Sequence, residues 1–176
     1  MLWGIISLVL GWSGNFVIHA RTLNIQSFEL TSPAFPNDHW IPTIYTCQGK
    51  GISPPLKWRY VPKGTKSFSL ICEDLDAPGW IFFHWIIYNI SGSLRSLPKN
   101  ISRISPLGFE QGINSFGYIG FGPFCPPNGV HRYKFLLYAL NGFLKLKSGI
   151  SAKHLQAVLQ GHILGKAELM GLYKGQ

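Results

Sequence analysis

The stretch Cys72-Glu73-Asp74-Leu75-Asp76-Ala77-Pro78-Gly79 ends an apolar run in two acids and a Pro/Gly turn, and His84-Trp85 follows shortly after it. A second stretch, Gly122-Pro123-Phe124-Cys125-Pro126-Pro127-Asn128-Gly129-Val130-His131-Arg132-Tyr133, leads from a Pro/Gly-rich turn into another apolar run. If the two stretches meet in space, their acid, imidazole and phenol groups form a small polar pocket in a rigid rim. Hydrogen-bonding groups of this kind suit a small anion such as a phosphate head group.

The composition is that of one folded domain rich in strands. The chain has 176 residues, of which 46% are hydrophobic and 13% charged, so it can bury a substantial core and is not a disordered chain. It contains 20 Gly and 12 Pro, and 14% of its residues are aromatic, which favours turns and strands over long helices.

The formal net charge is +9, and a basic surface attracts anionic partners. The basic residues are scattered, and no run of them is interleaved with stacking aromatic residues. Specific nucleic-acid binding is therefore not predicted. A weak contact with an anionic membrane surface is one candidate interaction, and a homodimer is another.

The first 20 residues resemble a secretory signal peptide. They contain no Lys, Arg, Asp or Glu, have an apolar core over 3–10, and end at the small residue Ala20. We therefore expect export to the periplasm or the medium, with a single domain over residues 21–176. The alternative is a cytoplasmic protein in which residues 1–20 are not a functional signal.

Hydrophobic periodicity predicts mostly strands. The segments 67–73 and 82–90 are almost continuously apolar, as in central strands that are buried on both faces. Ser151 is the expected N-cap of one helix, with an apolar stripe formed by Leu155, Val158, Leu159, His162 and Ile163. An antiparallel or mixed β-sandwich with peripheral helices follows, with its strands expected at 23–30, 43–47, 56–60, 67–73, 82–90, 130–140 and 167–173.

Side-chain alternation gives the expected site its geometry. On a strand, His131 and Tyr133 point to the same face and Arg132 to the opposite face, where it is expected to pair with a carboxylate. Each candidate also has a structural interpretation: a core histidine for His84, and turn-capping acids for Asp74 and Asp76.

Motifs of several enzyme classes are absent from the sequence. It has no G-x-S-x-G, no H-E-x-x-H and no C-x-x-C, and neither a metal nor a cofactor is expected. Cys125 is the only candidate nucleophile. Among Cys47, Cys72 and Cys125, one pair could form a disulfide, but three buried thiols are an equally open interpretation.

Ordered motifs resemble the phosphatidylethanolamine-binding protein family, in its bacterial Raf-kinase-inhibitor-like branch. They are Tyr45-Thr46-Cys47, Ser53-Pro54-Pro55-Leu56, Asp74-Leu75-Asp76-Ala77-Pro78, His84-Trp85, Cys125-Pro126-Pro127, His131-Arg132-Tyr133, and the tail from Gly161-His162 to Ala167-Glu168-Leu169. Two positions depart from the family pattern. Leu75 stands where proline is usual, so a looser turn is expected, and Phe124 is expected to narrow the pocket or cover its mouth.

The resemblance implies an antiparallel β-sandwich in which a central sheet packs on a smaller one, with a few peripheral helices. It also implies a pocket for phosphate-like anions lined by Asp74, Asp76, His84, Pro126, His131 and Tyr133. The expected function is non-catalytic binding of a small anion or phosphorylated group, with modulation of a partner protein as an extension. The alternative is a hydrolase or isomerase that uses Asp74 or His131 for proton transfer.

Overall fold

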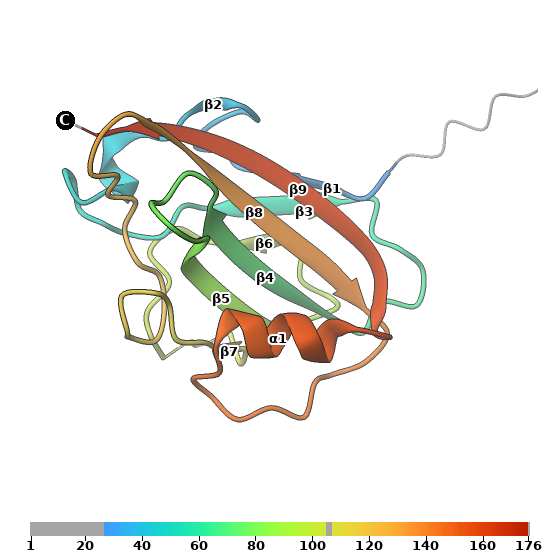
Figure 1. Ribbon diagram of the computed structural model, residues 1–176. Coiled ribbons are helices and arrows are strands. Elements are labelled where there is room, and N and C mark those ends of the chain that lie inside the picture. Colours follow the sequence, from blue (N-terminus) through green and yellow to red (C-terminus); the bar gives the residue numbers. More distant parts are fainter. Residues whose placement is uncertain (1–26, 105–106, 176) are drawn as a thin grey trace, which may run out of the picture.

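The computed structural model describes residues 27–104 and 107–175, which form two packed β-sheets and one α-helix (Figure 1). The smaller sheet contains three strands in the order β1-β3-β6, and the larger contains six in the order β2-β9-β8-β4-β5-β7. The elements are β1 (Glu29–Thr31), β2 (His39–Trp40), the 3₁₀ turn η1 (Thr43–Tyr45), β3 (Leu56–Arg59), β4 (Ser67–Asp74), β5 (Phe82–Ser91), β6 (Ser96–Leu97), β7 (Glu110–Gln111), β8 (Val130–Leu140), α1 (Ala152–Leu159) and β9 (Ile163–Lys174).

The long strands β4, β5, β8 and β9 form the antiparallel centre of the larger sheet. β4 pairs with β8 from Ser67↔Leu140 to Asp74↔Tyr133 without a register shift. The short β2 adds to β9 in parallel, and the other strand pairs of both sheets are antiparallel. The predicted fold class, a mostly β sandwich of a larger and a smaller sheet, is therefore confirmed, although the described residues contain one α-helix rather than a few.

The larger sheet is buried on both faces, which explains its continuous apolar runs. Along β4, Phe68 and Leu70 pack toward the smaller sheet with Trp58, whereas Ile71 packs on the opposite face with Leu155 of α1. All eight residues of β4 are buried. Alternating side chains thus serve two cores, and the sandwich core is the larger one.

The helix begins where the sequence predicts and ends earlier. The Ser151 hydroxyl accepts a hydrogen bond from the backbone N–H of His154, 3.2 Å away, which caps the first turn. The predicted stripe is wrong at its end, because α1 stops at Leu159 and Ile163 already belongs to β9. Gly161 has a φ of +81°, and this left-handed conformation turns the chain out of the helix.

Other expected boundaries also change. The segment 43–47 is not a strand, because the N–H of Tyr45 and of Thr46 donate to the carbonyls of Pro42 and Thr43 and close a 3₁₀ turn. β9 begins earlier than predicted, since it pairs along the full length of β8. Of the strand expected at 23–30, Glu29–Thr31 is observed as β1, and residues 23–26 lie outside the described residues.

Within residues 27–104 and 107–175, no helix has the length and apolar character required to cross a membrane. The segment 1–20, expected to be an export signal, lies outside the described residues.

Candidate functional site

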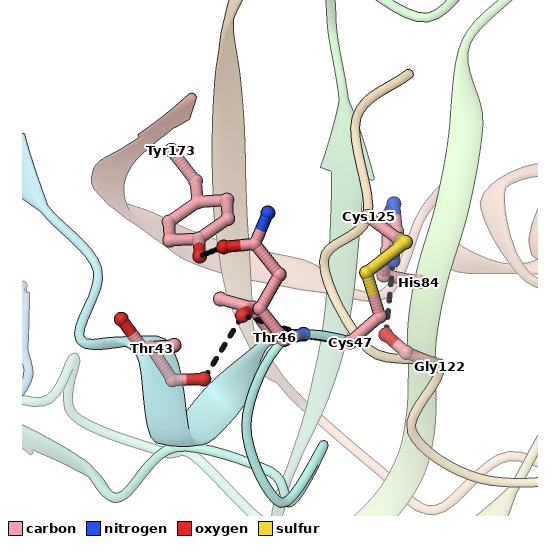
Figure 2. The surroundings of a disulfide bond; sticks show 8 residues. Thr43, Thr46, Cys47, His84, Gly122, Cys125 and Tyr173 are labelled. Carbon is pink, nitrogen blue, oxygen red and sulfur yellow. Dashed lines mark hydrogen bonds between the residues drawn. A yellow bond between two sulfur atoms is a disulfide. The ribbon is translucent and has the colours of Figure 1, made fainter. Parts of the chain in front are cut away.

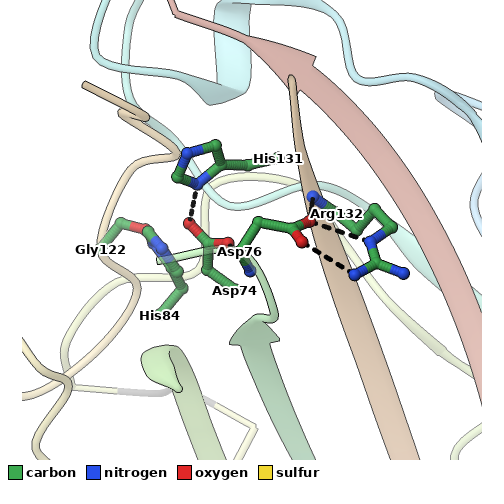
Figure 3. Close-up of polar contacts among 6 residues, drawn as sticks. All are labelled: Asp74, Asp76, His84, Gly122, His131 and Arg132. Atoms are coloured by element: carbon green, nitrogen blue, oxygen red, sulfur yellow. Dashed lines mark hydrogen bonds and ion pairs between the residues drawn. The ribbon is translucent and has the colours of Figure 1, made fainter. Parts of the chain in front are cut away.

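The ends of β4 and β8 bring the two sequence motifs together. Asp74, the last residue of β4, lies opposite Tyr133 in the β4–β8 register. His131 is two residues before Tyr133 and points to the same face, so that its Nδ1 lies 2.7 Å from the Asp74 Oδ2 (Figure 3). An ionised carboxylate only accepts hydrogen bonds, so His131 donates to Asp74. Both side chains are almost fully buried.

A β-bulge in β5 aims His84 at the same place. Cys72 pairs with Trp85, but the next residue, Glu73, pairs with Phe83, so the ladder skips His84. An extra residue of this kind changes the direction of a side chain locally. His84 and Trp85 are consecutive and yet both fully buried: Trp85 enters the sandwich core, and His84 lies at its rim beside Phe82.

A hydrogen bond to the backbone of Gly122 fixes the orientation of the His84 ring. The His84 Nδ1 lies 2.9 Å from the Gly122 carbonyl oxygen, to which it donates, and the Gly122 N–H donates to the His84 carbonyl. Four aromatic rings, those of Phe82, Phe116, Phe124 and Tyr133, surround the imidazole at centroid distances of 5.0–5.7 Å. Burial in this apolar cage lowers the pKa of His84 to about 4, so the ring is neutral at physiological pH.

Asp74, His84 and His131 face a cavity of about 170 Å³, called here the rim cavity. It lies at one end of the interior strands of the larger sheet, where β4 ends and β5 and β8 begin. Three of the predicted site residues, Asp74, His84 and His131, line it. The remaining lining residues are Ala77, Pro78, Phe82, Phe116, Cys125 and Pro127.

Asp76 does not line the rim cavity, contrary to the prediction. Its carboxylate accepts from the backbone N–H of Arg132 and from the guanidinium Nε and Nη2, at distances of 2.8–2.9 Å (Figure 3). These hydrogen bonds hold the pKa of Asp76 below its ordinary value. The prediction that Arg132 points away from His131 and pairs with a carboxylate is confirmed, and the Arg132 guanidinium is what draws Asp76 out of the site.

The turn between the two acids is not loose. The N–H of Leu75 donates to the Arg132 carbonyl at 3.0 Å, which proline could not do, and the N–H of Asp76 donates to the Asp74 Oδ1 at 2.9 Å. Leu75 thus adds a bond to the β4–β8 ladder in place of the rigidity that proline supplies. The expectation of a looser turn is wrong for this reason.

The structure places three other residues differently from the prediction: Tyr133, Pro126 and Phe124. Tyr133 is fully buried beneath the rim cavity, and Pro126 is buried while its neighbour Pro127 lines the wall. Within the described residues, the Tyr133 hydroxyl has no hydrogen bond of acceptable geometry. Burial, and then the nearby Asp74 charge, raise its pKa above the ordinary value. Phe124 neither narrows nor covers the cavity, because its ring packs against Tyr133 at 4.4 Å within the core.

Sequence reasoning missed Phe82 and Phe116, which form the aromatic wall of the cavity. Phe116 belongs to the loop before Gly122, where the buried Asn114 accepts from the Phe116 N–H and donates to the Gly120 carbonyl. A Cβ at Gly122 would lie 2.5 Å from the Phe116 ring, so the ring rests directly on the glycine. The only signal in the sequence was the length of the loop, which is typical of functional loops.

A disulfide joins Cys47 to Cys125 and fixes the opposite wall (Figure 2). It connects the segment after η1 to the turn that precedes Pro127, and the Cys47 N–H donates to the Phe124 carbonyl at 3.1 Å. The pairing left open from the sequence is thus resolved, and Cys72 is a buried free thiol. Because Cys125 is in the disulfide, the candidate nucleophile carries no free thiol.

The described residues contain no group of three or more His, Cys, Asp or Glu side chains that could hold a metal ion. The titratable side chains that line the rim cavity are one carboxylate and two imidazoles. These can accept, donate and transfer protons.

Fold and cavity together define a class: two-sheet β proteins with a small cavity at the ends of the central strands, where an acid and two histidines converge. The family model for the phosphatidylethanolamine-binding protein matches residues 31–174. The chain belongs to the phosphatidylethanolamine-binding protein family.

Curated relatives of both bacterial and archaeal origin support this assignment. A UPF0098 protein of Methanothermobacter thermautotrophicus is 45% identical over 148 residues, which cover 83% of this chain and 98% of the relative. A UPF0098 protein of Aquifex aeolicus is also 45% identical, over 150 residues that cover 83% of this chain and 88% of the relative.

Two solved structures have the same fold. The putative phosphatidylethanolamine-binding protein homolog CT736 of Chlamydia trachomatis is similar with a TM-score of 0.80 and 41% identity, covering 85% of this chain and 99% of the other. YbcL of E. coli, described as a new member of the mammalian PEBP family, has a TM-score of 0.80 and 33% identity, covering 86% and 100%.

Proposed function

We propose that this protein binds a small anion or the phosphorylated end of a ligand in the rim cavity, without transforming it. The observation that carries the proposal is the convergence of Asp74, His84 and His131 on one small cavity at the ends of the central strands. Family membership supports it, since the resemblance implies a pocket for phosphate-like groups at these motifs.

The size of the cavity limits the ligand. At about 30 Å³ for each water-sized group, 170 Å³ accommodates roughly five or six such groups, about the size of a phosphate with one substituent atom. Sites for drug-sized ligands are larger, from about 300 Å³ upward. The rest of a larger ligand would therefore remain outside the mouth of the cavity.

The proposal is tested by titrating inorganic phosphate and phosphoethanolamine while observing the imidazole signals by NMR. His84 and His131 line the cavity, whereas His39, His154 and His162 do not and serve as internal controls. We expect the first two to shift in a saturable way at millimolar ligand. Unmoved His84 and His131 signals would refute the proposed function.

One observation favours the alternative, an acid–base enzyme. The buried Asp74–His131 hydrogen bond of 2.7 Å resembles the pairs that orient a histidine for proton transfer. The disulfide at Cys125 removes the candidate nucleophile and weakens this alternative. If turnover of a phosphoester is found, it should be lost in His131→Ala and Asp74→Ala, and turnover that survives both changes would exclude the alternative.

We propose an oxidising compartment as the site of action. The Cys47–Cys125 disulfide supports export, because such bonds persist mainly outside the cytoplasm. Modulation of a partner protein and formation of a homodimer stay predictions.

A membrane surface is a proposed source of the anion. Trp80 and Ile81, 73% and 47% exposed, lie in the turn between Pro78 and Phe82 beside the rim cavity. Tryptophan favours the membrane interface, and the net charge of +9 favours anionic lipids. Cosedimentation with vesicles that contain anionic lipid should fall in Trp80→Ala relative to the native protein, and equal cosedimentation would contradict this source.

A further inference from the structure

We propose that the rim cavity selects anions that still carry a proton, such as a singly protonated phosphate group, over fully ionised anions. This inference rests on the proposed function and specifies the chemical form of the ligand. It follows from the donors and acceptors that face the cavity.

The Asp74 carboxylate gives the cavity an acceptor wall. Its Oδ2 accepts from His131 and its Oδ1 accepts from the Asp76 N–H. Each carboxylate oxygen can accept two hydrogen bonds, so Asp74 retains acceptor capacity toward a ligand. A fully ionised anion has only acceptors to offer in return, and its charge has the same sign as that of the carboxylate.

His84 provides a second acceptor. Its Nδ1 donates to the Gly122 carbonyl, so in the neutral ring Nε2 carries a lone pair and no proton. Gly122 does not line the cavity, and the ring edge available to a ligand is therefore the one that carries Nε2. Burial keeps this imidazole neutral down to a pH near its pKa of about 4.

His131 supplies the donor that binds the anionic oxygen. Its Nδ1–H donates to Asp74, so Nε2 carries a proton only when the ring is an imidazolium, and it is this charged form of His131 that donates to a ligand through Nε2–H. A ligand with one ionised oxygen and one hydroxyl satisfies both sides: the oxygen accepts from His131, and the hydroxyl donates to His84 or Asp74.

The other charged groups of the neighbouring strands do not change this inventory. On β8, Tyr133 is neutral and buried, and the Arg132 guanidinium is bound to Asp76 outside the cavity. None of the nine residues that line the cavity in the described part of the chain is Lys or Arg. The described basic residues behind the net charge of +9 therefore lie outside the cavity. Protein sites for dianionic phosphate ordinarily use Lys or Arg, and the described lining of this cavity has neither.

The test compares four probes between about pH 5 and about pH 9, a range that includes the second pKa of a phosphate monoester, near 6. The dissociation constants of inorganic phosphate, sulfate, phosphoethanolamine and methylphosphonate for the native protein are measured by the NMR titration. Phosphate should bind about tenfold or more tightly than sulfate at the acid end, because sulfate has no proton to donate to the buried acceptors.

The pH at which binding weakens should follow the ligand. We expect a higher midpoint for methylphosphonate, whose second pKa is higher, than for phosphoethanolamine, because each of these ligands loses its last phosphoryl proton at its second pKa. Any change in the charge of the protein with pH is common to all the ligands, so the difference between ligands isolates the proton on the ligand. One common midpoint, or equal affinity for phosphate and sulfate, would overturn the inference and leave the proposed function intact. No binding of any probe would refute both.

A variant provides an independent readout. In His84→Gln, the carboxamide can turn an N–H toward the cavity, so the preference for phosphate over sulfate should shrink several-fold. His162→Gln, at an exposed contact with Asn141, is the matched control and should keep the native preference. An unchanged preference in a folded His84→Gln protein would contradict the role of His84, and if that variant does not fold, the ligand series decides alone.

Discussion

His131 donates a hydrogen bond of 2.7 Å to Asp74, although 57 residues separate them in the sequence. The two side chains are 7% and 6% exposed, and they join the start of β8 to the end of β4 at the wall of the rim cavity. The same carboxylate also accepts from the Asp76 N–H. One side chain thus fixes both the turn after β4 and the orientation of the imidazole.

Asp74→Asn should destabilise the fold by about 1–3 kcal/mol. Each carboxylate oxygen accepts one N–H, whereas an amide has a single acceptor oxygen and turns an N–H toward the other donor. Urea unfolding monitored by tryptophan fluorescence measures the loss. Asp38→Asn, at an exposed acid, is the control and should unfold close to the native protein, and equal stability of the two variants would contradict the account.

The Asp76–Arg132 ion pair should make stability depend on acid pH. Its hydrogen bonds lower the pKa of Asp76 from 3.8, so the contribution is complete above that pH and is lost as the pH falls through the folded-state pKa. Arg132→Gln should be less stable than the native protein near neutral pH, and the two stability curves should converge below pH 3.8.

Urea midpoints at a series of pH values measure this effect. Lys99→Gln removes a positive charge from an exposed residue, and its curve should run parallel to that of the native protein. Curves for Arg132→Gln and the native protein that also stay parallel into acid would show that the ion pair does not contribute.

The Cys47–Cys125 disulfide should stabilise the native state by roughly 4 kcal/mol, since it closes a loop of 78 residues. Reduction should therefore lower the melting temperature and also weaken phosphate binding, because Cys125 is part of the cavity wall. Cys47→Ser should melt like the reduced native protein and should not respond to reductant. A native protein that melts at the same temperature with and without reductant would refute this.

Gly122→Ala should disturb the cavity without removing a polar group. The added Cβ would lie 2.5 Å from the Phe116 ring, so the ring must move, at a cost of about 1–3 kcal/mol for overpacking. Phosphate affinity should fall as the aromatic wall opens. Gly142→Ala, where a Cβ meets nothing within 4 Å, is the matched control, and equal affinity and stability of the two variants would contradict the packing.

Much of the fold could be predicted because its strands are long and continuously apolar. The bounds of β8 agree with the prediction, since Val130–Leu140 alternates and pairs on both sides. The errors lie at short elements. Backbone hydrogen bonds after Pro42 turn the expected strand at 43–47 into a 3₁₀ turn, and pairing with β8 takes Ile163 away from the helix.

The site could be predicted only in part, because a motif shows which residue types are present but not where their side chains point. The prediction that Asp74, at the end of β4, meets the histidine of β8 is confirmed by their hydrogen bond. Asp76 is directed outward by a competing guanidinium, and His84 is directed inward by a bulge that exists only once β4 and β5 pair. The aromatic wall depends on Phe116 resting on Gly122, a contact between residues of one loop that no periodicity reveals.

A crystal structure of the protein grown with inorganic phosphate would show directly whether the rim cavity holds an anion. We expect a tetrahedral anion in the rim cavity, within hydrogen-bonding distance of His131 Nε2 and of His84 Nε2 or the Asp74 carboxylate. A cavity that holds only water while phosphate occupies other surface sites would contradict it.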